Sequence, residues 1–261
     1  MIDKLFFRKK TKATARLPAG HRIYAIGDIH GELELLEGLL RRIHHDDQDR
    51  PNAPGELIFL GDLIDRGPHS AQVVDRLLRL RETRPGTRFL LGNHEAAFLA
   101  ALEGNIEALR HFVRIGGRET IISYGITPEA YQSADFQELS RMLQPVVPQS
   151  HRSFLQSFEH LIVTGDYVFV HAGIRPHVPL EEQSLADLLL IRREFLRSAS
   201  PSDKVVVHGH SIHEDVVQLP HRIGLDTGAW RYGTLSAMGF EGTKRWVLQE
   251  RRDLPKQLQR S

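Results

Sequence analysis

The sequence of 261 residues contains no cysteine. This absence excludes disulfides, thiolate zinc sites, iron–sulfur clusters and a cysteine nucleophile. The chain also lacks an apolar run near the roughly 20 residues needed to span a bilayer. Met1–Arg16 has no sustained apolar stretch of the kind found in a secretory signal. The formal net charge is only +1, so we expect no nucleic-acid partner. These absences favour a cytoplasmic protein without a membrane span.

Histidine, by contrast, is abundant at 15 residues, so imidazole is the available nitrogen ligand and proton carrier. The hydrophobic share of 41% and the charged share of 26% are typical of a soluble globular protein. The length suits one large α/β domain. We expect a basic flexible tail over residues 1–20, one domain over residues 21–250 and a C-terminal tail over residues 251–261.

The first hundred residues alternate between short β-prone runs that end at glycine and segments with helical spacing. Strands are predicted at Arg22–Ile26, Leu57–Leu60 and Arg88–Leu91, helices near 33–43, 70–82 and 95–102, and a loop at 46–56. This alternation is typical of a parallel sheet, in which ligands bind at the carboxyl ends of the strands. The fold class is therefore predicted to be α/β.

The later sequence has a different character. Residues 105–160 are mostly helical in pattern and are interrupted by Gly116-Gly117 and by three prolines, which predicts a helical cap inserted over the sheet. From Ile162 onward, short β-prone runs predict a second, mixed or antiparallel sheet. These runs are residues 162–164, 167–171, 204–208, 222–225, 234–238 and 244–248.

Polar clusters follow the first three predicted strands. They read Gly27-Asp28-Ile29-His30-Gly31, Gly61-Asp62-Leu63-Ile64-Asp65-Arg66-Gly67 and Gly92-Asn93-His94-Glu95, and two later runs end in His171-Ala172-Gly173 and His208-Gly209-His210-Ser211. Carboxylate, imidazole and amide oxygen are the ligands that hard or borderline divalent cations prefer. One such cluster alone is more often a turn, whereas the joint pattern predicts a metal site with a bridging carboxylate.

The motifs GDIHG, GDLIDRG and GNHE, followed by HAG and GHS, resemble the phosphoprotein phosphatase family of metallophosphoesterases. Within that family the chain is most similar to bacterial serine/threonine phosphatases related to phage lambda phosphatase. The resemblance runs from about Ile23 to about Met238. It implies a calcineurin-like metallophosphatase fold, with two β-sheets between helical layers and a helical cap. It also implies two divalent metal ions, with manganese expected and iron or zinc as alternatives.

The resemblance also implies a role for each residue of these motifs. The metal ligands would be Asp28 and His30 for the first ion, Asp62 for both, and Asn93, His171 and His210 for the second. His94 would donate a proton to the leaving group and Asp65 would orient it. Arg66 and Arg192 would bind the phosphate, with Arg193 as the alternative to Arg192.

The resemblance predicts a metal-dependent phosphomonoesterase, and first of all a protein serine/threonine phosphatase acting on phosphorylated proteins or peptides. Hydrolysis would proceed by direct attack of a metal-bridging hydroxide. The alternatives are a symmetrical diadenosine tetraphosphatase-like nucleotide hydrolase and a broad-specificity small-molecule phosphatase. The expected pattern of the nucleotide hydrolases has Gln in place of His30 and lacks the Asp65–Arg66 pair, which argues against that alternative. The intact ligand set argues against a binding module that has lost catalysis.

The His208-Gly209-His210 segment offers two histidines to the second ion. The family pattern of a strand followed by Gly-His aligns His210 and leaves His208 in the strand. We predict that His210→Ala loses bound metal and that His208→Ala keeps it, as measured by elemental analysis of the purified variants. Metal loss in His208→Ala together with metal retention in His210→Ala would make the assignment wrong.

Overall fold

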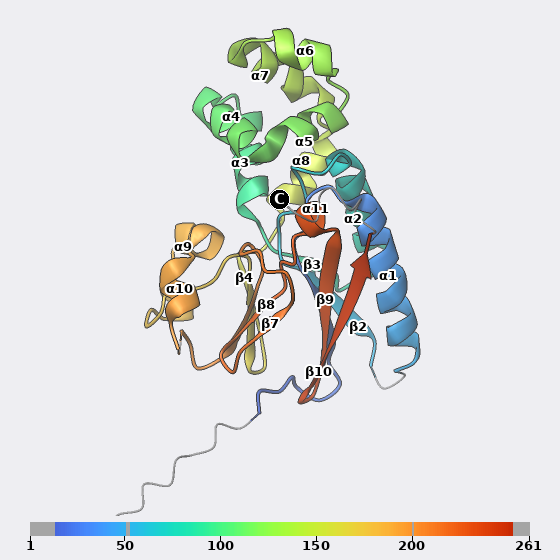
Figure 1. Ribbon diagram of the computed structural model, residues 1–261, viewed down its shortest axis with the longest axis vertical. Helices are drawn as coiled ribbons and strands as arrows, with labels where there is room; N and C mark the ends of the chain where they lie inside the picture. The colour runs from blue at the N-terminus through green and yellow to red at the C-terminus, as the bar shows by residue number, and fades with distance from the viewer. Residues whose placement is uncertain (1–13, 51–52, 200, 253–261) are drawn as a thin grey trace, which may run out of the picture.

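Two five-stranded sheets lie face to face, and helices cover the outer face of each (Figure 1). The computed structural model describes residues 14–50, 53–199 and 201–252. Helices α1 (Leu33–Gln48) and α2 (Ser70–Thr83) lie on the first sheet. Helices α9 (Leu185–Leu190) and α10 (Arg193–Arg197) lie on the second. This layering confirms the predicted α/β/β/α fold.

The first sheet has β1 (Arg22–Ile26) at its centre, in the strand order β10-β9-β1-β2-β3. Strand β1 runs parallel to β2 (Gly55–Phe59) and antiparallel to β9 (Thr234–Glu241). Strands β3 (Arg88–Phe89) and β10 (Lys244–Arg251) form the edges. We expected the last two strands of the chain in the second sheet, and this was wrong. Because every residue of β1 is buried, its polar backbone needs partners on both edges, and β9 pairs with the edge opposite β2.

The second sheet is mixed, as predicted. Strand β4 (Leu161–Thr164) is antiparallel to β5 (Tyr167–Val170), and β5 is parallel to β6 (Val205–His208). Strand β8 (Arg222–Gly224) is parallel to β6 and antiparallel to β7 (Val217–Gln218). The carboxyl ends of β1, β2, β5 and β6 therefore lie along one edge of the two sheets.

The hydrophobic core has three layers that follow from the alternation of side chains along each strand. Tyr24 and Ile26 of β1 pack in the layer under the helices, whereas Ile23 and Ala25 pack between the sheets. A third layer lies between the second sheet and α9 and α10, and Phe195 belongs to it. Strand β1 thus contributes to two layers, and its side chains between the sheets pack against those of the second sheet.

Helix α1 extends to Gln48, into the segment predicted as a loop. Two consecutive carboxylates at its end anchor it to the sheet. Asp46 accepts hydrogen bonds from Tyr24 Oη at 2.6 Å and from Trp246 Nε1 at 2.9 Å. Asp47 accepts one from the buried Arg22 at 2.9 Å. These contacts with strands far away in the sequence explain why local composition alone predicted an earlier end.

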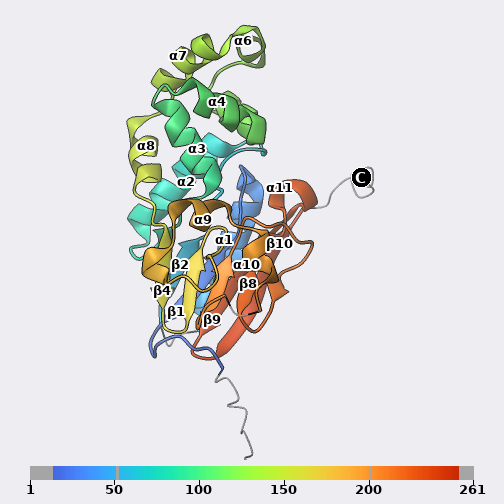
Figure 2. The same cartoon turned by 90° about the vertical axis from the view of Figure 1, so that its left-hand side faces the viewer.

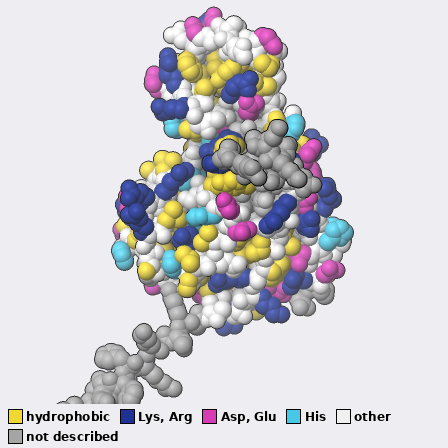
Figure 3. All heavy atoms as spheres, in the orientation of Figure 1, with side chains coloured by type: hydrophobic (Ala, Val, Ile, Leu, Met, Phe, Trp, Pro, Cys, Tyr) yellow, Lys and Arg dark blue, Asp and Glu magenta, His cyan; other side chains and the backbone are white. Residues whose placement is uncertain are grey.

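The predicted cap over residues 105–160 forms a lobe of short helices above the sheets (Figures 1 and 2). Its elements are α4 (Ile106–Phe112), the π-helical turn η1 (Val113–Gly117), α5 (Arg118–Ser123), α6 (Pro128–Ser133), α7 (Phe136–Val146) and α8 (Gln149–Gln156). Figure 3 shows hydrophobic side chains on the face of this lobe that is turned to the viewer. The insertion returns at Glu159, whose N–H donates to Phe89 O at 2.9 Å. Strand β3 ends at Phe89, two residues earlier than predicted, and Leu90 forms a single parallel bridge with Glu159.

The remaining helices are α3 (Asn93–Leu102), the 3₁₀ turn η2 (Leu180–Glu182) and α11 (Ala229–Tyr232). In the described part of the chain, none of the helices combines the length and the apolar character that a membrane crossing requires. Leu17 is buried and its N–H donates to Gly242 O at 2.9 Å, so packed structure begins before residue 21. Residues 1–13 and 253–261 of the expected tails lie outside the described residues.

The layer between the sheets gives a stability prediction. Phe240 of β9 is fully buried, and its ring lies 4.9 Å from that of Tyr167. Phe240→Ala should lower the free energy of unfolding by about 3–5 kcal/mol, because it removes a large side chain and leaves a cavity. Val163 of β4 is 46% exposed. Val163→Ala should therefore change the free energy of unfolding by only about 0.5 kcal/mol. Urea denaturation of both variants measures the difference, and equal losses would contradict this view of the core.

Candidate metal centre

The six predicted metal ligands come together at the edge where the parallel strands end. Asp28 and His30 follow β1 and Asp62 follows β2. His171 follows β5, His210 follows β6, and Asn93 begins α3. All except Asn93 are buried. Five chain segments that are distant in sequence thus contribute to one cluster, as expected for ligands at the carboxyl ends of strands.

The carboxylate of Asp62 lies at the middle of this cluster. Its Oδ2 atom is 3.7 Å from His30 Nε2 and 3.8 Å from His94 Nε2, and its Oδ1 atom is 3.4 Å from His171 Nε2. Two groups of side chains can each hold one metal ion, with ligand atoms within 4.8 Å of one another. They are His30, Asp62 and His94, and Asp62, His171 and His210. Asp62 belongs to both, which is the place of a bridging ligand.

Two of the imidazoles are oriented by backbone carbonyls. His30 Nδ1 donates to Ile64 O at 2.8 Å, and His171 Nδ1 donates to Leu60 O at 2.8 Å. Each Nε2 atom is then left as the nitrogen that a metal ion would bind. Burial lowers the pKa of both rings, which favours the neutral form that binds metal.

The buried charges also fit divalent cations. The Asp28 carboxylate accepts the N–H of His210 at 2.9 Å. Its pKa is raised well above the ordinary range by burial and by Asp226 and Asp62. Three buried carboxylates so close together repel one another, and bound cations would relieve this repulsion. Oxygen and imidazole donors without thiolates suit manganese, iron or zinc, so the residues present fit the two expected ions.

His208 does not belong to either group of ligands. Its ring lies edge-on to Phe195 at 5.0 Å, and its Nε2 atom is 3.4 Å from Arg222 Nη1. It is fully buried on the face of β6 that turns toward α10. The structure thus brings His210, and not His208, to the cluster around Asp62.

The predicted proton donor is held by its predicted partner. His94 Nδ1 donates to Asp65 Oδ2 at 2.5 Å, and both side chains are buried. Burial alone would lower the pKa of His94, but Asp62 and Asp65 outweigh it and the pKa rises. The imidazolium form is therefore favoured, but Nε2 faces the N–H of Arg66 Nη2 at 3.1 Å, so a proton on Nε2 requires Arg66 to turn to the substrate phosphate.

Both predicted phosphate-binding arginines reach the cluster. Arg66 Nη1 and Nη2 lie 2.9 Å from His30 Nε2 and 3.1 Å from His94 Nε2. Arg192 Nε lies 2.9 Å from His210 Nε2 on the other side of Asp62. Arg193, the alternative to Arg192, begins α10; both arginines are exposed, and the contact with His210 is made by Arg192. The two guanidinium groups therefore flank the site that the ligands define.

The family model for calcineurin-like phosphoesterases matches residues 21–252, almost the entire chain. This chain belongs to that family. Its members use divalent metal ions, in agreement with the donor set described above. The finer resemblance to lambda-like serine/threonine phosphatases is not what the similar proteins support.

Named relatives of this phosphoesterase are nucleotide hydrolases. The asymmetrical bis(5'-nucleosyl)-tetraphosphatase PrpE of Anoxybacillus flavithermus is 26% identical over 241 residues, which are 82% of this chain and 89% of the relative. The symmetrical bis(5'-nucleosyl)-tetraphosphatase of Acidovorax ebreus is 31% identical over 160 residues. That match covers 61% of this chain and 47% of the relative, so the chain spans about half of that enzyme.

A similar solved structure is described as a candidate diadenosine tetraphosphatase. Its TM-score is 0.62 at 23% identity, over 90% of this chain and 98% of that one. At this identity the likeness shows the fold alone. The relatives favour the nucleotide hydrolase that we ranked second, although His30 and the Asp65–Arg66 pair are present. The protein phosphatase reading, which we ranked first, is not confirmed.

Glu95 is a residue of the site whose role the motif alone did not reveal. Its buried carboxylate accepts the N–H groups of Asp62 at 2.9 Å, Leu63 at 2.8 Å and Gly92 at 3.0 Å. Burial, together with Asp62, raises the pKa of Glu95 to about 8. Glu95 thus ties the loop after β2 to the start of α3. The signal in the sequence is the third helical position after Gly92, where a Glu commonly bonds back to the cap.

The phosphoesterase stores backbone strain at its site. Among the described residues, six other than glycine have positive φ, and five of these are predicted site residues. They are His30, Asp62, Asp65, Arg66 and His210, with φ between 48° and 73°. Such conformations are uncommon and cluster at functional sites.

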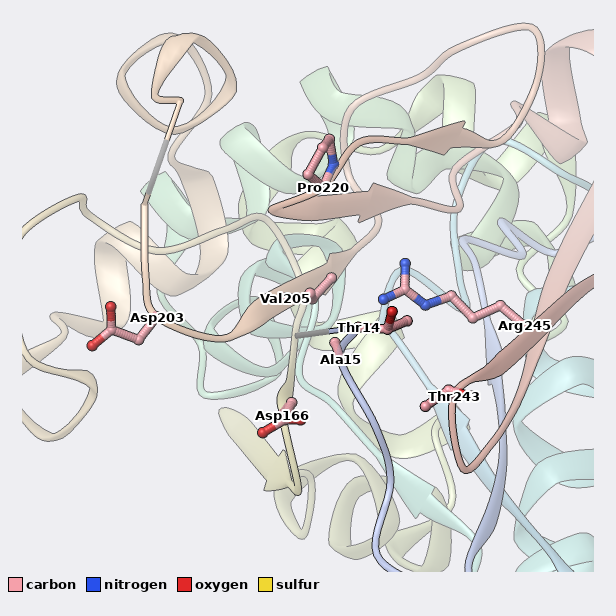
Figure 4. Close-up of a pocket in the computed structure, with 8 residues that line it drawn as sticks. All are labelled: Thr14, Ala15, Asp166, Asp203, Val205, Pro220, Thr243 and Arg245. Carbon is pink, nitrogen blue, oxygen red and sulfur yellow. The ribbon is translucent and has the colours of Figure 1, made fainter. Parts of the chain in front are cut away.

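A cavity of about 530 Å³ lies elsewhere in the molecule (Figure 4). Asp166, Val205 and Pro220 line it just before or at the start of β5, β6 and β8. The other lining residues are Thr14, Ala15, Asp203, Thr243 and Arg245. The amino ends of these strands lie opposite the edge that holds Asp62, so this cavity is not part of the metal centre.

The contacts of Arg66 predict its contribution. Arg66→Ala should raise KM and lower kcat without loss of metal, and reduce kcat/KM about ten- to one-hundredfold, because a charged hydrogen-bond donor to the phosphate is lost. Arg79→Ala removes the same charge from an exposed side chain of α2 and serves as the control. Steady-state kinetics and elemental analysis provide the readouts. Loss of metal in Arg66→Ala would show that the residue is structural.

Proposed function

We propose that this phosphoesterase hydrolyses bis(5'-nucleosyl) tetraphosphates asymmetrically, to a nucleoside triphosphate and a nucleoside monophosphate. The observation that carries the proposal is the pair of guanidinium groups, Arg66 and Arg192, that lie on either side of the ligands around Asp62. Two guanidinium groups at opposite sides of the metal ligands suit a substrate with several phosphates in a row. The asymmetrical enzyme of Anoxybacillus flavithermus, which is matched over 89% of its length, supports the choice of cleavage.

The residues of the chain have separate parts in this chemistry. Asp28, His30, Asp62, Asn93, His171 and His210 would hold two divalent ions, which supply a water of lowered pKa and neutralise phosphate charge. Arg66 and Arg192 would grip nonbridging phosphate oxygens. His94, held by Asp65, would give a proton from Nε2 to the departing oxygen.

An aromatic ring beside Arg66, one of the two predicted phosphate-binding arginines, supports a nucleotide substrate. The partly buried indole of Trp230 lies 5.1 Å from the guanidinium carbon of Arg66. Trp230 lies on α11, at the carboxyl edge of the sheets. Every nucleobase has a flat π face that can stack on an aromatic side chain.

A phosphorylated protein or peptide is the second candidate substrate, and one observation favours it. A protonated histidine held at 2.5 Å by a buried carboxylate is most useful when the leaving group is a basic alkoxide, as in phosphoserine. A nucleotide leaves as a phosphate oxyanion and needs this proton less. The two candidates therefore make different demands on His94.

A substrate panel separates the candidates. Manganese-loaded protein should convert diadenosine tetraphosphate to ATP and AMP, which chromatography separates and quantifies. It should act more slowly on a phosphoserine peptide and on a phosphodiester. Asp62→Asn, which replaces the shared ligand, is the control against contaminating hydrolases. Turnover of the phosphopeptide alone would reverse the choice of substrate, and two ADP products would change the cleavage mode. Inactivity with manganese, nickel, cobalt and iron would refute the enzymatic proposal.

A further inference from the structure

Thr120, a residue of the helical insertion, touches the carboxylate that orients His94. The Thr120 hydroxyl donates to Asp65 Oδ1 at 2.6 Å and accepts the Asp65 N–H at 2.9 Å. Thr120 and Asp65 are both fully buried. The other carboxylate oxygen, Oδ2, accepts the Nδ1–H of His94 at 2.5 Å. Thr120, Asp65 and His94 therefore form one continuous chain of hydrogen bonds.

The direction of this chain follows from the single proton of a threonine hydroxyl. Two acceptors lie within reach of it, Asp65 Oδ1 at 2.6 Å and Ser70 Oγ at 2.9 Å. The shorter contact to a carboxylate is the stronger of the two, so the proton points to Asp65. The Asp65 N–H is also shared with Ser70 Oγ at 3.0 Å. Thr120 thus forms hydrogen bonds with both the side chain and the backbone of Asp65.

The helical insertion also positions Arg66, one of the two predicted phosphate-binding arginines. Gly116, in the turn η1, accepts the N–H of Arg66 through its carbonyl at 3.1 Å. Gly116 has φ 121°, and a Cβ atom there would lie 2.8 Å from Arg66 Cγ. A side chain at this position would displace Arg66. The insertion is therefore part of the reactive site as well as a cover above it.

We propose that Thr120 is a positioning residue for proton transfer to the leaving group, acting through Asp65 on His94. Without the Thr120 hydroxyl, Asp65 Oδ1 loses its donor from α5, and the carboxylate is free to rotate away from His94. The imidazole then loses the partner that aims its Nε2 atom into the site. The proposal rests on phosphoester hydrolysis, which is the chemistry of the family, and not on the choice of a tetraphosphate as substrate.

The test compares two esters whose leaving groups differ in basicity. Phenolate, with a pKa near the value of about 10 for tyrosine, needs a proton much more than p-nitrophenolate does. Thr120→Val keeps the branched shape and removes the hydroxyl. Its kcat on phenyl phosphate should fall about ten- to one-hundredfold, and its kcat on p-nitrophenyl phosphate less than about threefold. KM and metal content should not change, and Thr120→Ser should restore the wild-type ratio.

Ser123 provides a matched control on the same helix. Its hydroxyl accepts the N–H of Ala71 at 3.1 Å and donates to Thr120 O at 2.7 Å, so it links α5 to α2 without touching Asp65. Ser123→Ala should leave the ratio of the two rates at the wild-type value. An equal fall on both esters in Thr120→Val, or no fall on either, would refute the positioning role. Inactivity of the wild-type protein on all phosphoesters would instead refute the proposed function.

A spectroscopic measurement tests the same contact without substrate. The short hydrogen bond from His94 Nδ1 to Asp65 should give a proton NMR signal at low field, assigned by its loss in Asp65→Asn. Thr120→Val should shift or broaden this signal, and Thr120→Ser should preserve it. A signal that is identical in wild type and Thr120→Val would overturn the proposal, whichever esters the enzyme accepts.

Discussion

Four imidazoles converge on the buried carboxylate of Asp62, and the arrangement of the site depends on this interaction. Burial alone would raise the pKa of Asp62, but positive charge on the imidazoles of His171, His94, His30 and His210 lowers it well below its ordinary range. Among these four rings, His94 is the one whose own pKa is raised, so it carries this charge most readily. From the other side, Glu95 binds the backbone N–H groups of Asp62 and Leu63. The loops after β1, β2, β5 and β6 must therefore keep their relative places, and the two packed sheets supply that rigidity.

Much of this site could be predicted from the sequence, because its motifs are local. Each cluster follows directly on a short apolar run, and parallel strands bring their carboxyl ends together by geometry. Features that depend on distant partners could not be predicted. The end of α1 rests on the contact between Asp46 and Trp246, 200 residues apart. The pairing of β9 with β1 joins the two ends of the domain.

The same limit applies to the residues that support the site. Thr120 reaches Asp65 across 55 residues of sequence, from a six-residue helix in a segment whose pattern predicts only a helical cap. The substrate is harder still to predict from the sequence, because it is selected by the charge and shape of several loops together. The motifs favoured a phosphoprotein, whereas whole-chain relatives favour a dinucleotide. The metal ligands are common to both chemistries and therefore cannot choose between them.

The positive φ angles at His30, Asp62, Asp65, Arg66 and His210 set stability against activity. A side chain held in such a conformation costs of order 1–3 kcal/mol, and glycine would relieve that strain at once. A selection for heat resistance alone would therefore favour glycine at these positions and produce robust but inactive proteins. Thermostable forms of this enzyme should instead be sought by changes far from the strained loops, in the sheets and in the outer helices.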